Sequence, residues 1–505
     1  MKPWILRTLL VGVGIGLALA AGIALYGSRT TLPPGMTVSG WSVGGWEESR
    51  FREGLEERVE SLRNKKVAMK GELPNDGETS RSATLGELGL LTNADILLAD
   101  VERLFTGPVW KRALLRWQWR DRALTLELGL EDPALASAVK KLWPELYESQ
   151  PIDAKRTIAA GDRVVYTPEV PAVRIDEAKL PQAAMAALSG GGGAGIPGPV
   201  GLIAHPEALR ADGPLLSAEP LSLPLPVTQV QPKVTVASLK AQGIERVIAS
   251  YTTSFASSAE GRKHNVSKTA SVVHDRLMAP GDVFDYAKII KETEEKFGFR
   301  EAPVILNGKL VPGIGGGICQ VSTTLYNAVL RAGLEIVERR NHSLPVSYAP
   351  LGQDATFAEG YINFKFRNST DKYILIRTSS EGGRLTVKLF GTMDPGVSYD
   401  IKSVTLKEIA PPTKYVKNPA LPAGSVELLQ QGKPGYVVET YRYKKVNGKV
   451  VDQERISKDT YKAQPTLYGS NAGGGAEGGA PESDGERILE DGVLGPVFEA
   501  PAEGV

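Results

Sequence analysis

The most informative stretch of the sequence is Gly313-Ile314-Gly315-Gly316-Gly317-Ile318-Cys319-Gln320-Val321-Ser322-Thr323-Thr324-Leu325-Tyr326-Asn327. The glycines just ahead of Cys319 allow a positive φ and let the backbone approach a ligand closely. Apolar residues then recur at helical spacing. They are Ile318, Val321, Leu325, Ala328, Val329 and Ala332. The pattern predicts a flexible loop that leads into a helix with one buried stripe, with Cys319 in the first helical turn.

Cys319 is the only cysteine in the chain, and two interpretations of it stay open. In the first turn of a helix, a thiol meets unpaired N–H groups and the positive end of the helix dipole. Both favour the thiolate and therefore a nucleophile. A lone cysteine is, on the other hand, commonly a small hydrophobe buried only for packing.

The length and charge of the chain limit the number of domains and the kinds of partner that we expect. A chain of 505 residues has room for two to four domains at about 150 residues each. The 59 basic and 58 acidic side chains nearly cancel, so no nucleic-acid partner is implied by charge. One cysteine excludes an intrachain disulfide and a cysteine-rich metal site. The four histidines lack the spacing of metal ligands, so we expect no metal site. They are His205, His264, His274 and His342. We expect no other cofactor either.

The N-terminus predicts export. Residues 5–26 are almost uncharged, and their core is marginally long enough to span a bilayer. Lys2 and Arg7 precede that core, which predicts a cytoplasmic N-terminus and an extracytoplasmic body. We therefore expect residues 1–30 to form a short cytoplasmic stub and a single-pass signal anchor in the cell membrane. A cleaved signal peptide is the alternative, because Ala18-Leu19-Ala20 resembles a cleavage site.

The remainder predicts a multi-domain α+β protein. Residues 35–230 alternate short strand-like and amphipathic helical segments, and residues 240–395 form a second region of the same kind. Residues 400–468 are rich in strand signals, with a β-hairpin predicted on both sides of Asn447-Gly448. Residues 469–505 are rich in Gly, Ala, Glu and Pro, which predicts a disordered acidic tail.

The first region carries a family resemblance. The sequences VSGWSVGGWEES and, later, TLGELGLL resemble the peptidoglycan-binding domain often found ahead of a VanW domain. The resemblance covers residues 35–230 in short pieces and implies peptidoglycan as a partner. Alternatively, this region is an α+β spacer that holds the next domain away from the membrane.

A longer resemblance follows. The block GIGGGICQVSTTLYNAVLRAGLEIVERRNHSLPVSYAPLGQDATF is similar to the VanW family, and the resemblance places a VanW domain at residues 240–395. One departure is the run Phe284-Asp285-Tyr286-Ala287, where the family usually has a Phe-Ser-Phe-Asn-like run. Residues 400–468 resemble part of a G5-type module. The VanW family is named for an accessory gene of glycopeptide-antibiotic resistance, which implies a role at the cell wall.

Three residue types needed for thiol acyl transfer lie in this block. Cys319 would be the nucleophile, His342 would take and return a proton, and Asp354 would orient the imidazole. The alternatives are structural roles: His342 lies at the surface or caps an element, and Asp354 caps a turn beside Gly352.

Five further residues are candidates for substrate binding. The N–H groups of Gly316, Gly317 and Cys319, together with Gln320, would form an oxyanion site. Ser322 would contact a polar ligand or else cap the helix. Arg339 would pair with a substrate carboxylate or else belong to a solvated face.

Location and chemistry together give two hypotheses. The first is a cysteine-dependent transfer like that of an L,D-transpeptidase, with Cys319 attacking a wall stem peptide. The second is a non-catalytic peptidoglycan-binding or accessory protein of the vancomycin-resistance type, with Cys319 buried for packing. The position of the Cys319 sulfur relative to the His342 ring discriminates between them. The sequence predicts no oligomeric state.

Overall fold

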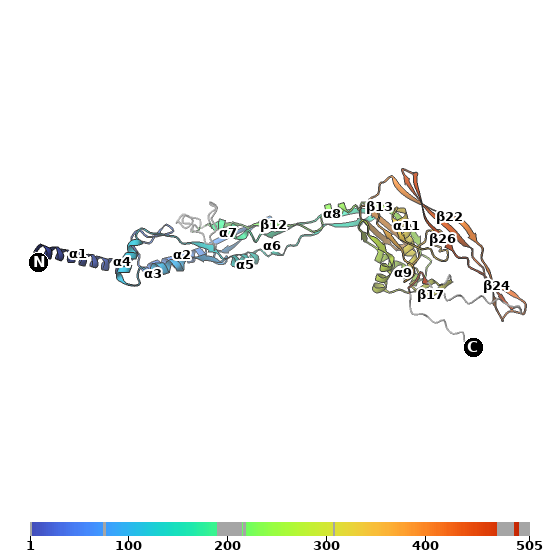
Figure 1. The fold of residues 1–505 in the computed structure, drawn as a ribbon, viewed down its shortest axis with the longest axis horizontal. Helices are drawn as coiled ribbons and strands as arrows, with labels where there is room; N and C mark the ends of the chain where they lie inside the picture. The colour runs from blue at the N-terminus through green and yellow to red at the C-terminus, as the bar shows by residue number, and fades with distance from the viewer. Residues whose placement is uncertain are drawn as a thin grey trace. The chain divides into compact units, whose positions relative to one another are not determined.

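The computed structural model describes residues 3–73, 77–188, 215, 219–306, 309–471 and 489–493. Helices and strands are mixed in a multi-domain layout, which confirms the predicted α+β class (Figure 1). The chain divides into two compact units. The first consists of Met1–Asp153 and Glu169–Lys233, and the second of Ala154–Pro168 and Val234–Val505.

The first unit begins with α1 (Pro3–Gly27). Within it, Arg7–Gly27 is long and apolar enough to cross a membrane, by length and composition only. An N-terminal helix of this kind is either a single-pass span or a signal sequence. Both alternatives expected from the sequence therefore stand.

The rest of the first unit packs small sheets and helices around a core that includes Phe51, Leu55 and Trp143. Its sheets have the strand orders β2-β1-β6, β11-β3-β4, β5-β7 and β10-β12. The helices are α2 (Glu48–Arg63), α3 (Ala94–Glu102), α4 (Val109–Gln118), α5 (Asp132–Leu142), α6 (Glu145–Glu148) and α7 (Leu180–Leu188). The strands are β1 (Thr37–Val38), β2 (Trp41–Ser42), β3 (Lys66–Leu73), β4 (Gly77–Thr84), β5 (Leu90–Thr92), β6 (Ala123–Leu124), β7 (Leu128–Leu130), β10 (Ala172–Ile175), β11 (Leu221–Pro224) and β12 (Val227–Val230).

The second unit is built on an antiparallel sheet with the order β13-β21-β20-β14. Its strands are β13 (Arg246–Ser254), β21 (Arg384–Gly391), β20 (Ile374–Ser379) and β14 (Arg276–Met278). In β21, Leu385, Val387 and Leu389 are fully buried, at the spacing of two that puts side chains on one face of a sheet. Two helices, α9 (Glu260–Val273) and α11 (Ile318–Arg331), pack against this sheet and against each other.

Shorter elements surround this centre, and two of them matter for the site. Strand β16 (Glu301–Leu306) pairs with β17 (Lys309–Ile314), which leads into α11. The others are β8 (Lys155–Ala159), β9 (Arg163–Thr167), α8 (Val236–Ala241), β15 (Val283–Asp285), α10 (Tyr286–Phe297), β18 (Glu335–Glu338), β19 (Lys365–Arg367) and the 3₁₀ turns Ala160–Asp162 and Glu381–Gly383.

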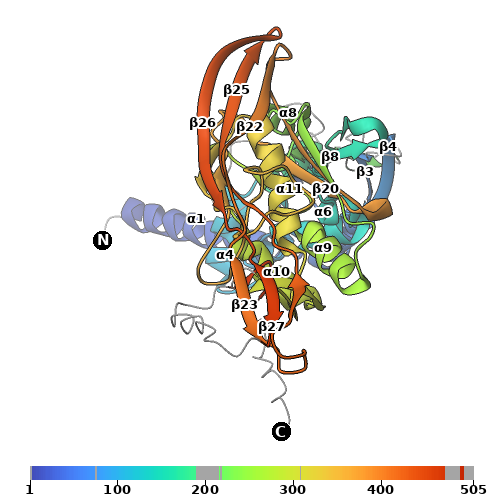
Figure 2. The same cartoon turned by 90° about the vertical axis from the view of Figure 1, so that its right-hand side faces the viewer.

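Long strands form the next part of the second unit. Figure 2 shows β22, β25 and β26 running together. The hairpin predicted around Asn447-Gly448 is confirmed: both residues have a positive φ, 49° and 79°, as a type I′ turn requires. The strands are β22 (Val397–Ile409), β23 (Thr413–Lys417), β24 (Val426–Gln430), β25 (Gly435–Val446), β26 (Lys449–Tyr461) and β27 (Thr466–Ser470).

Part of the predicted tail lies in the fold. Residues 472–488 and 494–505 are outside the described residues, but β28 (Leu489–Glu490) pairs antiparallel with β16 as the edge strand of the order β17-β16-β28. Val493 is 1% exposed, and its N–H donates to the carbonyl of Ile314. The acidic, glycine-rich composition of the tail as a whole hides this short stretch, because its apolar residues are few.

Candidate functional site

The site begins where β17 turns into α11. Gly315 and Gly317 have φ of 92° and 110°, values that side-chain-bearing residues rarely adopt, and Gly317 is the N-cap of α11. A Cβ at Gly316 would lie 2.4 Å from the carbonyl oxygen of Pro303. The glycines are therefore needed for this tight turn, and the predicted loop-to-helix transition with Cys319 in the first turn is confirmed.

Cys319 is completely buried. Its Sγ accepts a hydrogen bond from the N–H of Phe357 at 3.0 Å, and its own N–H donates to Asp491 Oδ1 at 2.7 Å. Burial raises the pKa of the Cys319 thiol well above its ordinary value, and the negative charge of Asp491 adds to this effect. In this state the helix terminus does not outweigh burial, and the thiol is protonated.

His342 and Asp354 form a buried pair. His342 Nδ1 lies 2.7 Å from Asp354 Oδ2, and the backbone N–H of His342 donates to the same oxygen. Burial alone would lower the pKa of His342, but the hydrogen bond and charge of Asp354 raise it. Burial alone would raise the pKa of Asp354, but the hydrogen bond and charge of His342, with the charge of Arg339, lower it to about 2. Each group therefore stabilises the charged form of the other.

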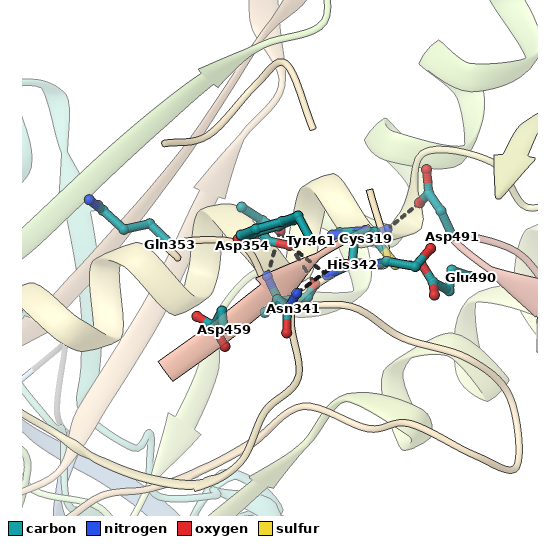
Figure 3. Close-up of polar contacts among 12 residues, drawn as sticks. Cys319, Asn341, His342, Gln353, Asp354, Asp459, Tyr461, Glu490 and Asp491 are labelled. Atoms are coloured by element: carbon teal, nitrogen blue, oxygen red, sulfur yellow. Dashed lines mark hydrogen bonds and ion pairs between the residues drawn. The ribbon is translucent and has the colours of Figure 1, made fainter. Parts of the chain in front are cut away.

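The second ring nitrogen of His342, Nε2, differs from Nδ1 in its contacts. His342 Nε2 is buried and has no hydrogen-bond partner in the part of the chain that the structure describes, while Nδ1 is held by Asp354. This is the arrangement in which a histidine presents one nitrogen for proton transfer. No hydrogen bond joins Cys319 to His342 among the described residues. Figure 3 shows both side chains with Asp491, whose charge acts on the two of them.

Further side chains hold the His342–Asp354 pair in place. The hydroxyl of Tyr461 donates to Asp354 Oδ1 and accepts from the N–H of Gly352. Arg339 Nη2 lies 3.3 Å from Asp354 Oδ1, and Arg339 Nη1 lies 2.7 Å from both carboxylate oxygens of Asp459. Arg339 is thus paired inside the protein, with its side chain only 4% exposed.

The candidate oxyanion donors contact a carboxylate. The N–H groups of Gly317 and Cys319 donate to Asp491 Oδ1 at 3.2 and 2.7 Å. Sequence reasoning missed Asp491, which lies more than 100 residues beyond the glycine block. Its only signal in the sequence was the short run Leu489-Glu490-Asp491-Gly492-Val493 inside an acidic tail.

The side chains of Gln320 and Ser322 make hydrogen bonds within the protein. Gln320 Nε2 donates to the hydroxyl of Thr253 and the carbonyl of Ser254, and its Oε1 accepts from Arg262. The hydroxyl of Ser322 donates to the carbonyls of Cys319 and Ala355. The carbonyl of Gly316 accepts from Asn265 Nδ2. These groups shape the site around the start of α11.

Comparisons with known proteins identify the region that holds this site. The family model described as VanW like protein matches residues 261–390, and the G5 domain model matches residues 401–467. The chain is 38% identical to the uncharacterized protein YoaR of Bacillus subtilis (strain 168) over 173 residues, 34% of this chain and 57% of that protein. It is 27% identical to the vancomycin B-type resistance protein VanW of Enterococcus faecalis (strain ATCC 700802 / V583) over 155 residues, 30% of this chain and 56% of that protein.

The chain contains a VanW-like region followed by a G5 segment. It spans somewhat more than half the length of these two relatives. A solved structure described as IgA1 Protease G5 domain structure is 28% identical, covers 15% of this chain and 92% of that chain, and has a TM-score of 0.13.

The site draws on three segments of the chain. Cys319, His342 and Asp354 lie in the VanW match. Tyr461, which holds Asp354, lies in the G5 match, and Asp491 lies beyond both. The G5 segment therefore supplies part of the support for the VanW site.

A cavity of about 640 Å³ adjoins the site between the VanW domain and the G5 segment. Three of its lining residues are basic: Arg262, Lys433 and Lys462. Asp491 and Tyr348 lie on its wall, and the buried hydroxyl of Tyr348 has no hydrogen-bond partner within the described residues. A cavity of this composition favours an anionic, partly apolar ligand.

The described residues contain no group of three or more His, Cys, Asp or Glu side chains that could hold a metal ion.

Proposed function

We propose that this protein acts on or at peptidoglycan, outside the cell membrane, with α1 as its single-pass anchor. The relative in Enterococcus faecalis is named for vancomycin resistance, and G5 domains are associated with binding to cell-wall components. The N-terminal region before the VanW match would add a second contact with the wall or act as a spacer.

At the Cys319 site we propose thiol-dependent acyl transfer on wall stem peptides, like that of an L,D-transpeptidase. One observation carries this proposal: Asp354 fixes His342 through Nδ1 and leaves the buried Nε2 without a partner among the described residues. The charge of Asp491 acts both on this pair and on Cys319 at the start of α11. Backbone N–H groups at that helix start already bind a carboxylate oxygen, so they offer an oxyanion site.

The chemical steps follow from these groups. His342 Nε2 accepts the thiol proton as Cys319 Sγ attacks the peptide carbonyl, and the N–H groups of Gly317 and Cys319 stabilise the oxyanion. The C–N bond then breaks, and His342 returns the proton to the leaving amine of the terminal D-residue. An amine from a neighbouring stem displaces the thiol and forms the new peptide bond. Water in its place would give a carboxypeptidase.

The other candidate residues have supporting roles in this proposal. Gly316 and Gly317 set the turn that aims the N–H groups, and Gln320 and Ser322 fix the first turn of α11. Arg339 acts through Asp354, because its guanidinium is used on Asp354 and Asp459. It is a positioning residue in this proposal and does not touch the substrate.

A trapping experiment tests the proposal. Purified full chain is incubated with a synthetic stem tetrapeptide, and intact mass spectrometry measures acyl adduct on Cys319. We expect an adduct that Cys319→Ala abolishes and that His342→Gln slows by roughly 100-fold, as loss of a general base does. His274→Gln is the matched control, since this histidine contacts the backbone of Thr378. An adduct that persists in Cys319→Ala would contradict the proposal.

The second candidate is a non-catalytic wall-binding or accessory protein. The burial of Cys319 and the raised pKa of its thiol favour it. It predicts that Cys319→Ser and His342→Gln leave sedimentation with isolated peptidoglycan unchanged and that the stem peptide forms no adduct with any variant. A loss of wall binding in Cys319→Ser would count against this candidate.

A further inference from the structure

The C-terminal segment Leu489–Val493 enters the site as a peptide ligand would. Leu489 and Glu490 pair with Leu306 and Ile305 at the free edge of β16. Further along, the N–H of Asp491 donates to the carbonyl of Phe357, and the N–H of Val493 donates to the carbonyl of Ile314. Addition of an extended segment to a sheet edge is a common mode of peptide recognition.

The two acidic side chains of this segment are both bound. Glu490 Oε2 accepts hydrogen bonds from the N–H and hydroxyl of Ser343 at 2.9 and 3.1 Å. Asp491 Oδ1 accepts from the N–H groups of Gly317 and Cys319. Hydrogen bonds to ionised groups are about twice as strong as neutral ones, so these contacts select for a peptide with two adjacent carboxylates.

The fit between segment and groove is also steric. A Cβ at Gly492 would lie 2.8 Å from the carbonyl oxygen of Ile314 and 2.8 Å from Val304 Cγ1. Only glycine fits there without a shift of the backbone. Val493 is buried in the same core cluster as Cys319. The contacts therefore extend well beyond the N-terminus of α11.

Near the segment, the described residues include buried polar groups that have no partner among them. They are His342 Nε2 and the hydroxyl of Tyr348. Buried polar groups in native proteins are nearly always hydrogen-bonded, so each calls for an explanation. A ligand with more polar atoms than the segment Leu489–Val493 would satisfy them.

We propose that the groove between β16 and the N-terminal end of α11 binds an extended acidic peptide, and that Leu489–Val493 fills it as an internal ligand that keeps Cys319 closed. The basic residues Arg262, Lys433 and Lys462 in the adjoining cavity complement an acidic ligand. Because the segment belongs to the same chain, it competes at a high effective concentration. An external peptide enters only when the segment leaves.

This inference deepens the proposed function, but its test needs no turnover. Cys319 is the only cysteine, so iodoacetamide modification of the folded full chain reports on this site alone. Asp491→Asn removes the charge that the N–H groups bind. Gly492→Ala keeps every charge and adds one methyl group where the backbone leaves no space. Gly485→Ala, in the same tail, is the matched control.

We expect Asp491→Asn and Gly492→Ala to raise the alkylation rate at least tenfold and Gly485→Ala to leave it unchanged. A synthetic peptide of residues 488–494 should restore slow alkylation in Gly492→Ala, and the same peptide with asparagine for its aspartate should not. Alkylation as slow in both variants as in the native chain would overturn the proposal. Fast alkylation that the peptide does not slow would overturn it too, since this is the result for a variant that has merely unfolded.

The same variants separate the two proposals. If the peptide protects Gly492→Ala but the stem tetrapeptide forms no adduct with that variant, acyl transfer is wrong and the peptide groove stands. If the adduct forms but the peptide does not protect, the groove proposal is wrong and acyl transfer stands.

Discussion

At Cys319 two physical effects act in opposite directions. The start of α11 offers N–H groups and a positive dipole, which favour a thiolate by typically less than 1 kcal/mol at the surface. Complete burial and the carboxylate of Asp491 favour the neutral thiol, and these effects prevail in the closed site. The raised pKa of the Cys319 thiol is therefore caused first by burial and then by Asp491, and these two effects outweigh its place in the helix.

The charged form of the Asp354 carboxylate is stabilised by contacts that form only in the folded protein. We expect Asp354→Asn to lower the free energy of unfolding by about 3 kcal/mol at pH 7, because His342 would be left buried without its carboxylate. The folded pKa of Asp354 is about 2, below its ordinary value of 3.8. Its stabilising effect is thus complete above about pH 4 and is lost as pH falls through 2.

Urea unfolding at pH 7, 5 and 3 measures this dependence. The difference between the native chain and Asp354→Asn should be larger at pH 5 than at pH 7, because Asp354 also raises the pKa of His342, and it should be smaller at pH 3 than at pH 5. Asp371→Asn, an exposed carboxylate in the turn after β19, is the control and should cost less than 0.5 kcal/mol. A difference that is constant down to pH 3 would show that the charge of Asp354 does not stabilise the fold.

The sequence predicted the candidate residues unevenly. Cys319, His342 and Asp354 could be named because they share one block of family resemblance, and the structure brings His342 and Asp354 into contact. Asp491 could not be named, because its role arises from a strand pairing between residues about 185 positions apart. Nor could Arg339 be placed, since its partner Asp459 lies 120 residues away. Local patterns carry no signal for such long-range pairs.

Among the elements, α11 differs most from its expectation. The sequence predicted one buried stripe, whereas every residue from Ile318 to Leu330 is buried. The sheet and α9 cover one side, and the polar residues of the other side find partners in loops, as when Asn327 Nδ2 donates to the carbonyl of Gln353. Periodicity identifies a helix and its most apolar face. It does not predict that a polar face is covered by another part of the chain.

Strand β26 of the G5 segment supports the VanW site through Tyr461. We expect Tyr461→Phe to cost roughly 1–3 kcal/mol of unfolding free energy, because Asp354 and the N–H of Gly352 would both lose a buried partner. The same change should also slow adduct formation at Cys319, since it loosens the carboxylate that orients His342.

Tyr443→Phe on the neighbouring strand β25 is the matched control, because no hydrogen bond of its hydroxyl is found in the described part of the chain. Thermal unfolding and the adduct assay should both leave this variant close to the native chain. Equal behaviour of the two phenylalanine variants would mean that the G5 segment does not stabilise the site.

On the scale of the whole molecule, the two units have separate cores, and composition predicted the multi-domain layout and the apolar N-terminal helix. It did not predict which elements α1 would meet. In the first unit, α1 packs against α4, where the hydroxyl of Tyr26 donates to the carbonyl of Arg116. Helix α4 exposes Trp110, Leu114 and Trp117 along one face, by 59%, 50% and 68%.

This exposed face argues for a retained anchor. Large apolar side chains at positions i, i+4 and i+7 form one stripe, and tryptophan is enriched at the membrane–water interface. The stripe borders α1 at Ala18, Gly22 and Tyr26. Cleavage after Ala20 would leave the stripe in water, so we expect α1 to remain and α4 to lie in the lipid interface.

Full chain reconstituted in vesicles tests this expectation with brominated lipids, which quench tryptophan fluorescence only on contact. Quenching should be strong in the native chain and weaker in Trp110→Ser/Trp117→Ser, because two exposed tryptophans would be lost from the interface while Trp4 of α1 stays in contact with lipid. Trp143→Phe should leave the amount of fluorescence that the lipid quenches unchanged, since Trp143 is fully buried in the core of the first unit.

A second measurement is the intact mass of the protein extracted from cells, which should correspond to a chain that includes residues 1–30. Equal quenching in both variants, or a mass that begins near residue 21, would exclude an interfacial α4 beside a retained α1.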